Sequence, residues 1–299
     1  MSQLKGYLLY APEDAKKNTA FINMFLKEAS MRGISLSLLL TTDKCLHKAE
    51  ADFIINRSRL PALSKALEQR GIRVFNDSNV CEICNDKQLT YDSLKSHQIP
   101  FMDFCWLKEM RTNKNPQTEN HLFYSGYIKK ARQFGYPFVI KPAGGHGGAH
   151  VSLIENEEHL YYSLKSVSKD YGYLPKLLFQ RCASDIGKDL RVYVLGGKIV
   201  AGMMRTRTDH ASDSEIRANF CLGAAASLHT LTKEETALTV QISAALPADL
   251  VGIDFVYHNG HAIFNEIEDA VGTRMLYQYT DIDIVKEYMD YIIKTLSAS

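Results

Sequence analysis

Residues 138–150 read FVIKPAGGHGGAH, and the interpretation of the whole chain starts from them. The apolar run from Phe138 to Ile140 predicts a buried strand, which ends on Lys141. A lysine at that position is costly to bury unless an anion accompanies it. Four glycines follow within five positions, namely Gly144, Gly145, Gly147 and Gly148. Because glycines let a backbone approach a ligand and point N–H groups at it, the stretch indicates a flap over phosphate.

The same stretch has a simpler alternative, and it lacks the two common nucleotide motifs. A glycine-rich hairpin with a lysine that reaches solvent would have the same sequence pattern. No Gly-Lys-Ser/Thr follows the glycines, so they do not form a P-loop. The G-x-G-x-x-G spacing reaches His150 instead of a third glycine, which excludes a Rossmann turn.

Length and composition are those of an ordinary globular protein. The 299 residues can bury a sizeable core and are expected to divide into two or three lobes. The formal net charge of +1 predicts no nucleic-acid or membrane partner, so any anion site must be local. We expect neither a signal peptide nor a bilayer-spanning run, and we interpret the six cysteines as reduced thiols of a cytoplasmic protein. For the C-x-x-C pair Cys81 and Cys84, a structural role is favoured over a zinc or redox site, because no second ligand pair accompanies it.

Residues 1–78 predict a small parallel α/β domain, because apolar strands alternate with amphipathic helices. Ligands of such sheets bind beyond the carboxyl ends of the strands. Arg57 and Arg59 follow the strand expected at 52–55, so they are candidates for binding a substrate carboxylate. The alternative is a solvated helix start. The polar run 76–79 marks a domain boundary.

Two hairpins are expected in the second half of the chain. In residues 189–207, a turn at Gly196-Gly197 joins two strands, and Asp189 and Arg191 share one face of the first strand. The polar stretch 208–220 is expected to form a loop over a site.

The second hairpin, 250–268, carries acids. Glu266 and Glu268 lie two residues apart and would meet Asp254 across the Asn259-Gly260 turn. Carboxylates this close repel one another unless a cation lies between them, and hard oxygen ligands favour Mg²⁺. An edge hairpin with solvated acids is the alternative.

Taken in chain order, these pieces resemble the ATP-grasp superfamily, specifically its RimK-like branch of glutamate and amino-acid ligases. The matching segments run from about Asp52 to the C-terminus and include Asn85–Lys87, Val139–Pro142 with its flap, Phe179-Gln180, Asp189–Arg191, 216–219, 223–227, Val251–Phe255 and Asn265–Glu268. The resemblance implies an α/β ATP-grasp fold with an N-terminal pre-ATP-grasp domain (1–78). A central lobe with the flap (79–175) and a C-terminal lobe with the Mg²⁺ site (176–299) would follow.

The resemblance also implies roles for single residues. Those expected to bind ATP are Lys87, Lys141, the flap residues Gly144, Gly145, His146, Gly147 and Gly148, the hinge Gln180, Arg181 and Cys182, and Asp189 near the ribose. Those expected around the γ-phosphate and acyl group are Arg191, Arg205, Arg217 and Lys141, with Asn219 beside metal or phosphate and Arg217 and Asn219 also at the substrate. Asp254, Glu266 and Glu268 correspond to the ligands of two Mg²⁺ ions, for which Mn²⁺ could substitute.

Three positions depart from the family pattern. Arg181 stands where many relatives have an acid, which puts adenine recognition by that side chain in doubt. Glu268 stands where RimK-like proteins usually have asparagine, and its extra charge could tighten Mg²⁺ binding or change metal preference. Residues 269–274 replace the usual small-residue and proline turn beside the acceptor, so the acceptor's identity cannot be transferred.

The resemblance implies an ATP-dependent carboxylate–amine ligase that forms an amide through an acyl phosphate. Its substrate would be an amino acid, a peptide or a protein C-terminus, and a homodimer or homotetramer would be typical of relatives. Two alternatives remain at this point: an ATP-grasp kinase acting on a hydroxyl, and a nucleotide-binding module without catalysis.

Overall fold

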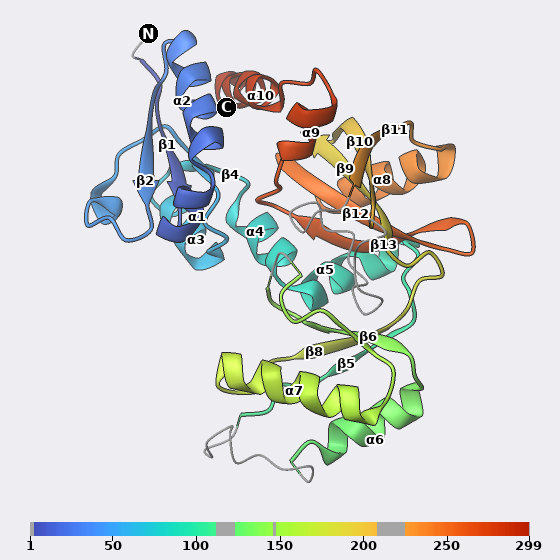
Figure 1. The fold of residues 1–299 in the computed structure, drawn as a ribbon. Helices are drawn as coiled ribbons and strands as arrows, with labels where there is room; N and C mark the ends of the chain where they lie inside the picture. The colour runs from blue at the N-terminus through green and yellow to red at the C-terminus, as the bar shows by residue number, and fades with distance from the viewer. Residues whose placement is uncertain (1–2, 112–122, 146–147, 208–224, 299) are drawn as a thin grey trace.

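The computed structural model describes residues 3–111, 123–145, 148–207 and 225–298, and its named strands form three sheets (Figure 1). The first sheet is parallel, in the order β2-β1-β3-β4, with β1 (Lys5–Tyr10), β2 (Ser35–Leu40), β3 (Phe53–Asn56) and β4 (Arg73–Phe75). Its helical segments are α1 (Pro12–Lys17), α2 (Thr19–Met31), η1 (Leu46–Lys48) and α3 (Pro61–Glu68). Gly6 is required in β1, because a Cβ atom there would lie 2.4 Å from the Phe53 ring. The prediction of a small parallel α/β domain is confirmed.

The middle sheet is antiparallel, in the order β5-β8-β6-β7, and carries the glycine stretch. Its strands are β5 (Phe104–Leu107), β6 (Phe138–Pro142), β7 (Ser152–Ile154) and β8 (Leu177–Arg181). Helices α6 (Ser125–Phe134) and α7 (Glu157–Tyr171) cover one face of it, and their apolar residues form a core of their own with Phe138, Ile140 and Phe179 (Figure 1). The range 176–299 had placed β8 with the C-terminal lobe, but β8 pairs with β5 and β6. Such pairing joins partners distant in sequence, so a local sequence pattern does not show it.

The third sheet is antiparallel, in the order β11-β10-β9-β12-β13. It contains both predicted hairpins, with β9 (Lys188–Leu195), β10 (Lys198–Thr206), β11 (Ala225–His229), β12 (Leu250–His258) and β13 (His261–Glu268). One face packs against α4 (Ser78–Asn85), α5 (Lys87–Leu94) and α8 (Lys233–Ala245), and the short helix η2 (Lys95–His97) follows α5.

The C-terminal helices join the third sheet to the first. Helices α9 (Arg274–Tyr279) and α10 (Ile284–Ala298) share one buried cluster with β1, α2 and β9. In Figure 1, α10 lies beside α2, and the two helices are in contact. No helix in the described part of the chain is long and apolar enough to cross a membrane.

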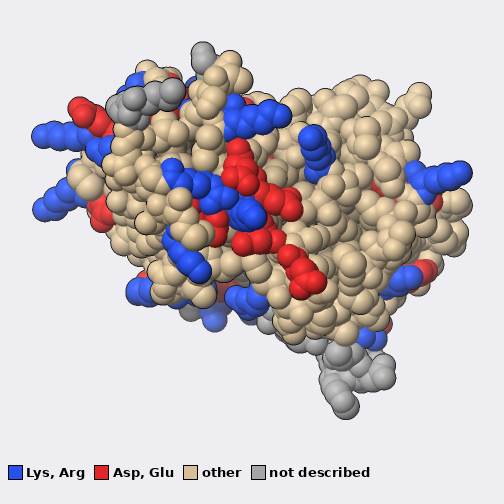
Figure 2. Space-filling view, turned by 90° about the horizontal axis from the view of Figure 1, so that it is seen from above, with Lys and Arg blue, Asp and Glu red and all other residues tan. Residues whose placement is uncertain are grey.

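Charged side chains are mixed where the N-terminal and C-terminal helices meet. On the face shown in Figure 2, acidic and basic side chains lie next to one another. Arg32, which follows α2, pairs with Glu28 on the same helix and with Asp290 of α10, the latter at 2.8 Å. Opposite charges therefore offset one another at the contact between these two helices.

The two cysteines of the C-x-x-C pair lie on α4. The Cys81 thiol is buried and accepts hydrogen bonds from the side-chain amides of Asn56 and Asn85, at 3.7 and 3.6 Å. Burial raises the pKa of both Cys81 and Cys84, which disfavours the thiolate that a metal or redox role would use. These contacts support the structural interpretation.

Candidate active site

A cavity of about 420 Å³ opens where the three sheets meet. It is lined by the end of β6, the hinge after β8, the inner faces of β9, β10, β12 and β13, and loops of the N-terminal domain. Of the site residues expected from sequence that are described, all except Gly144 line it. Gly144 instead bridges to Asp86, just before α5. His146, Gly147, Arg217 and Asn219, and the loop expected at 208–220, lie outside the described residues.

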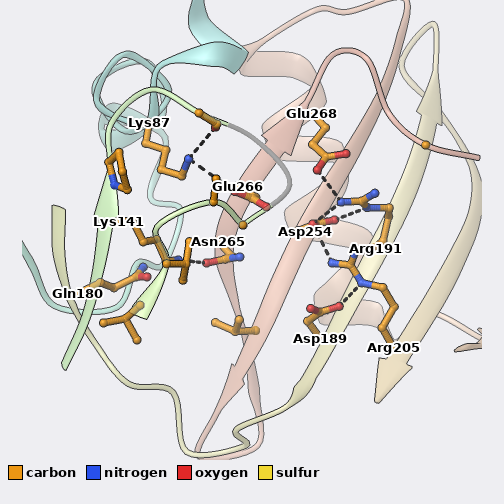
Figure 3. A pocket seen from close by; sticks show the side chains of 18 of the residues that line it. Lys87, Lys141, Gln180, Asp189, Arg191, Arg205, Asp254, Asn265, Glu266 and Glu268 are labelled. Carbon is orange, nitrogen blue, oxygen red and sulfur yellow. Dashed lines mark hydrogen bonds and ion pairs between the residues drawn. The ribbon is translucent and has the colours of Figure 1, made fainter. Parts of the chain in front are cut away.

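Two lysines approach one end of the cavity (Figure 3). Lys141 is buried at the end of β6, and its Nζ donates a hydrogen bond to Asn265 Oδ1 at 2.7 Å. The pKa of Lys141 is lowered to about 8, chiefly by burial; Glu266 opposes the shift and neighbouring Lys87 adds to it. Lys87 Nζ donates to the Gly145 carbonyl at 3.2 Å and lies 3.9 Å from Glu266 Oε2. Both ammonium groups are therefore beside the glycine stretch, as a phosphate site requires.

The hinge at the end of β8 offers backbone groups and one side-chain amide, that of Gln180, to the cavity. Gln180 is buried, and its Nε2 donates to the Tyr91 hydroxyl at 2.9 Å. The Arg181 guanidinium donates to the carbonyls of Phe134 and Gly135 and lies over the Phe134 ring. It thus binds the C-terminal end of α6, where a cation is favoured by the helix dipole. The sequence could not show this, because α6 and β8 are far apart along the chain.

Five charged side chains alternate in sign along the opposite wall (Figure 3). Arg191 makes a bidentate pair with Asp254, at 2.7 Å for each of two bonds, and Arg205 reaches the same carboxylate at 2.8 Å. Arg205 also binds Asp189, and Arg191 lies 3.0 Å from Glu268. Asp189 and Arg191 do point from one face of β9, as predicted.

This alternation sets the charges of the acids. Burial alone would raise the pKa of Asp254, but Arg191 and Arg205 hold it below its ordinary value. Burial raises the pKa of Asp189 to about 7, although Arg205 opposes the rise. Burial also raises the pKa of Glu268, against the attraction of Arg191. Asp254 is consequently the acid held most firmly as a carboxylate.

A β-bulge in β13 decides which side chains of that strand reach the cavity. Glu266 is opposite Asp254, but the next pair is Phe264 opposite Phe255, so Asn265 is an extra residue. Ala262, Phe264 and Ile267 all face the apolar core, which breaks the two-residue alternation. Strict alternation from Ala262 would have turned Glu266 and Glu268 into that core. The bulge instead leaves Asn265, Glu266 and Glu268 lining the cavity.

The N-terminal arginines bind a turn at the other end of the cavity. Arg57 Nη2 donates to the carbonyls of Ala270 and Val271, at 3.1 and 2.9 Å. Arg59 Nη2 donates to Ala270 at 3.2 Å, and its Nη1 lies 3.5 Å from Asp14. Both arginines therefore brace the turn 269–274, the segment in which the sequence departs from the family pattern. Arg59 remains partly exposed, whereas Arg57 is buried.

A family model described as the RimK-like ATP-grasp domain matches residues 92–292. The chain belongs to the RimK-like ATP-grasp family. It is 29% identical over 233 residues to N-acetylaspartylglutamate synthase A from Homo sapiens, covering 77% of this chain and 54% of the synthase. This chain thus spans about half the length of the curated synthases to which it is similar. It is also 28% identical over 291 residues to the uncharacterized protein MG011 of Mycoplasma genitalium, covering 95% of this chain and 89% of that protein.

Solved structures share the fold of this RimK-like chain. D-alanine–D-alanine ligase from Bacillus anthracis complexed with ATP superposes with a TM-score of 0.72 at 14% identity, covering 99% of this chain and 98% of the ligase. At that identity the likeness shows the fold alone.

The acids of this RimK-like site fit a divalent cation. Ligand oxygens of Asp254, Glu266 and Glu268 lie within 4.8 Å of one another, and no other group of three such ligands occurs among the described residues. Arg191 Nη2 lies within 3.0 Å of both Asp254 and Glu268, so a positive group already bridges two of the three acids. Carboxylate oxygens are ligands that suit Mg²⁺, so Asp254, Glu266 and Glu268 are the residues that would hold it.

Proposed function

We propose that this chain is an ATP-dependent carboxylate–amine ligase that forms an amide on an amino acid or peptide through an acyl phosphate. The observation that carries the proposal is a single cavity joining Lys87 and Lys141 to the acids Asp254, Glu266 and Glu268. Family membership supports it, since the human relative is a synthase whose named product contains a glutamate residue. A protein C-terminus is a further candidate substrate.

The chemistry asks for positioning and charge neutralisation. A substrate carboxylate oxygen attacks the γ-phosphorus of ATP and ADP leaves; an amine nitrogen then attacks the acyl carbon, and phosphate leaves with the loss of a proton. Lys87 and Lys141 would hold phosphate oxygens, and Arg191 and Arg205 would neutralise charge on the transferred group. Mg²⁺, when bound, supplies Lewis-acid neutralisation of the phosphates. This sequence of bonds requires no nucleophilic side chain of the protein.

Several narrower assignments belong to this proposal. Main chain of the hinge 180–182 would read adenine, because the Arg181 side chain is bound elsewhere. Asp189 would lie near the ribose, and the Gly144–Gly148 flap would cover the phosphates. Arg59 would bind a substrate carboxylate, with Arg57 bracing the turn beside it. Arg217 and Asn219 would contribute from outside the described residues.

Ion number, assembly and domain limits are further parts of the proposal. Two Mg²⁺ ions would bind, and Mn²⁺ could replace them. A homodimer or homotetramer would follow the pattern of relatives. We place the N-terminal domain at 1–78 and end the central lobe after β8, at about residue 181.

The test is ADP release from ATP and Mg²⁺ across a pool of amino acids and short peptides, with mass spectrometry of the products. The proposal expects an acid and an amine that together stimulate release and give a product mass equal to their sum minus water. A hydroxyl compound that gains phosphate would replace this proposal with a kinase. ATP binding without stimulated release by any pair, unchanged by Glu266→Gln, would leave a binding module.

A further inference from the structure

The family resemblance implies roles for many residues of the cavity, but it implies none for the bulge residue Asn265. Neighbouring residues on a regular strand point to opposite faces, yet Asn265 and Glu266 both line the cavity. The bulge is the cause, since it inserts Asn265 between the pairs Asp254–Glu266 and Phe255–Phe264. The backbone there is not left-handed, so other L-residues can adopt it. The strand thus gains one extra side chain directed at the nucleotide end.

The Asn265 side chain meets Lys141 (Figure 3). Its Oδ1 accepts the hydrogen bond from Lys141 Nζ at 2.7 Å, a contact across 124 positions of the chain. Within the described ranges, no carboxylate forms an ion pair with Lys141, although Glu266 is the next residue along β13 and lies nearer to Lys87. The buried ammonium is therefore held by a neutral acceptor in a site otherwise rich in acids.

We propose that Asn265 is a positioning residue, whose amide oxygen holds the Lys141 ammonium toward the cavity while leaving its charge available to a phosphate of ATP. The proposal rests on the proposed function only for the identity of the nucleotide. An aspartate here would form an ion pair with Lys141 in a low-dielectric site and compete with phosphate. An alanine would leave a buried ammonium without its acceptor.

The experiment measures the dissociation constant of ATP by calorimetry, without acid or amine substrate, for the full chain and three single variants. Asn265→Ala is expected to weaken ATP binding roughly tenfold, the usual size of a lost hydrogen bond to a charged group. Asn265→Asp, measured with EDTA so that an added carboxylate cannot gain from Mg²⁺, is expected to weaken it more than alanine does. Asn23→Ala, at an exposed position of α2, is the matched control and should leave the constant unchanged.

A double-mutant cycle separates positioning from a general structural role. If Asn265 acts through Lys141, adding Asn265→Ala to Lys141→Ala produces no further loss of ATP affinity. Equal losses in the presence and absence of Lys141 would overturn the proposal, as would wild-type ATP affinity in Asn265→Ala. If the alanine variant fails to fold, Asn265→Ser replaces it in the cycle. Serine retains a short acceptor, so this variant should bind ATP more weakly than the wild type but should not lose the affinity completely. Because ATP binding needs no second substrate, this pattern can hold even if no amide is ever formed.

Discussion

At the residue scale, the Lys141 ammonium has a pKa low enough for its charge to change in an accessible pH range. Burial lowers its pKa from an ordinary 10.5 to about 8, so the cationic form predominates only below that value. Affinity for ATP in the free protein is therefore expected to fall as pH rises through about 8. The measurement is the ATP dissociation constant from about pH 7.5 to 9.5, above the titration of the nucleotide's own phosphate. Lys141→Arg, which stays charged, should flatten the profile; an equally steep profile in that variant would assign the titration to another group.

Glu266 gives the second residue-scale prediction. Glu266→Gln removes one of the three carboxylate charges and should therefore weaken Mg²⁺ binding. Only two charged ligands of the trio then remain, and one of them, Asp254, already binds two arginines. We expect the Mg²⁺ concentration for half-maximal ADP release to rise by at least about tenfold. Glu234→Gln, at an exposed acid that pairs only with His261 in the described structure, is the control. A Mg²⁺ requirement that is the same in both variants would remove Glu266 from the metal site.

The sequence predicted single residues well where their spacing was local, and poorly where a distant partner decided the outcome. The convergence of Asp254, Glu266 and Glu268 could be predicted because two glutamates two positions apart share a strand face and a hairpin brings Asp254 opposite them, whereas their role as metal ligands stays a prediction. Asn265 was missed, although the three-residue spacing of Phe264 and Ile267 was a visible sign of a bulge. The direction of the Arg181 side chain could not be predicted, since its partner α6 lies some 46 positions away.

At the element scale, helix α8 begins with a capping box. Thr232 accepts from the Glu235 amide at 3.2 Å, and the Glu235 carboxylate accepts from the Thr232 amide at 2.7 Å, which completes the capping box. Thr232→Ala should therefore lower the free energy of unfolding by about 1 kcal/mol in urea titrations. Thr236→Ala, one turn later and exposed, should cost less than about 0.5 kcal/mol. Equal losses for the two variants would show that the cap is not what stabilises this helix.

The positions of strands could be predicted from the sequence, but the sheet to which each strand belongs could not. The strands β6, β9 and β10 were expected near their observed bounds, because apolar runs and turns are local signals. Assignment to a sheet is not local: β8 lies between β5 and β6, which precede it by about 40 residues or more. A domain boundary placed just before β8 consequently divided a sheet.

At the scale of the whole molecule, the N-terminal domain and the third sheet are joined by a buried polar link. The Asn76 side chain donates to the carbonyls of Leu250 and Asp269 and accepts from the amides of Asp249 and Leu250. Asn76→Ala leaves these buried groups without partners and should lower the free energy of unfolding by roughly 2–4 kcal/mol. Urea unfolding measures this free energy. Native-state hydrogen exchange of the amides in β1 and β12 is measured separately, and both strands should lose protection against exchange together. Loss of protection in only one of them would contradict a shared core.

The buried clusters divide the described molecule into two packed units. Helix α10 and α2 bury residues in one cluster, whereas the lobe carrying the glycine stretch has its own cluster around Phe138 and Leu160. Closure over a nucleotide would therefore move the middle lobe against a rigid pair formed by the N-terminal domain and the third sheet.

The measurement that tests the central claim most directly follows oxygen through the reaction. The carboxylic acid found in the ADP-release screen is labelled with ¹⁸O in its carboxylate and incubated with the amine, ATP, Mg²⁺ and the full chain. An acyl phosphate requires one carboxylate oxygen to leave with the phosphate, so we predict ¹⁸O in the inorganic phosphate in step with amide formation. Amide formation with unlabelled phosphate, or phosphate found on a hydroxyl instead, would contradict activation of a carboxylate at this site.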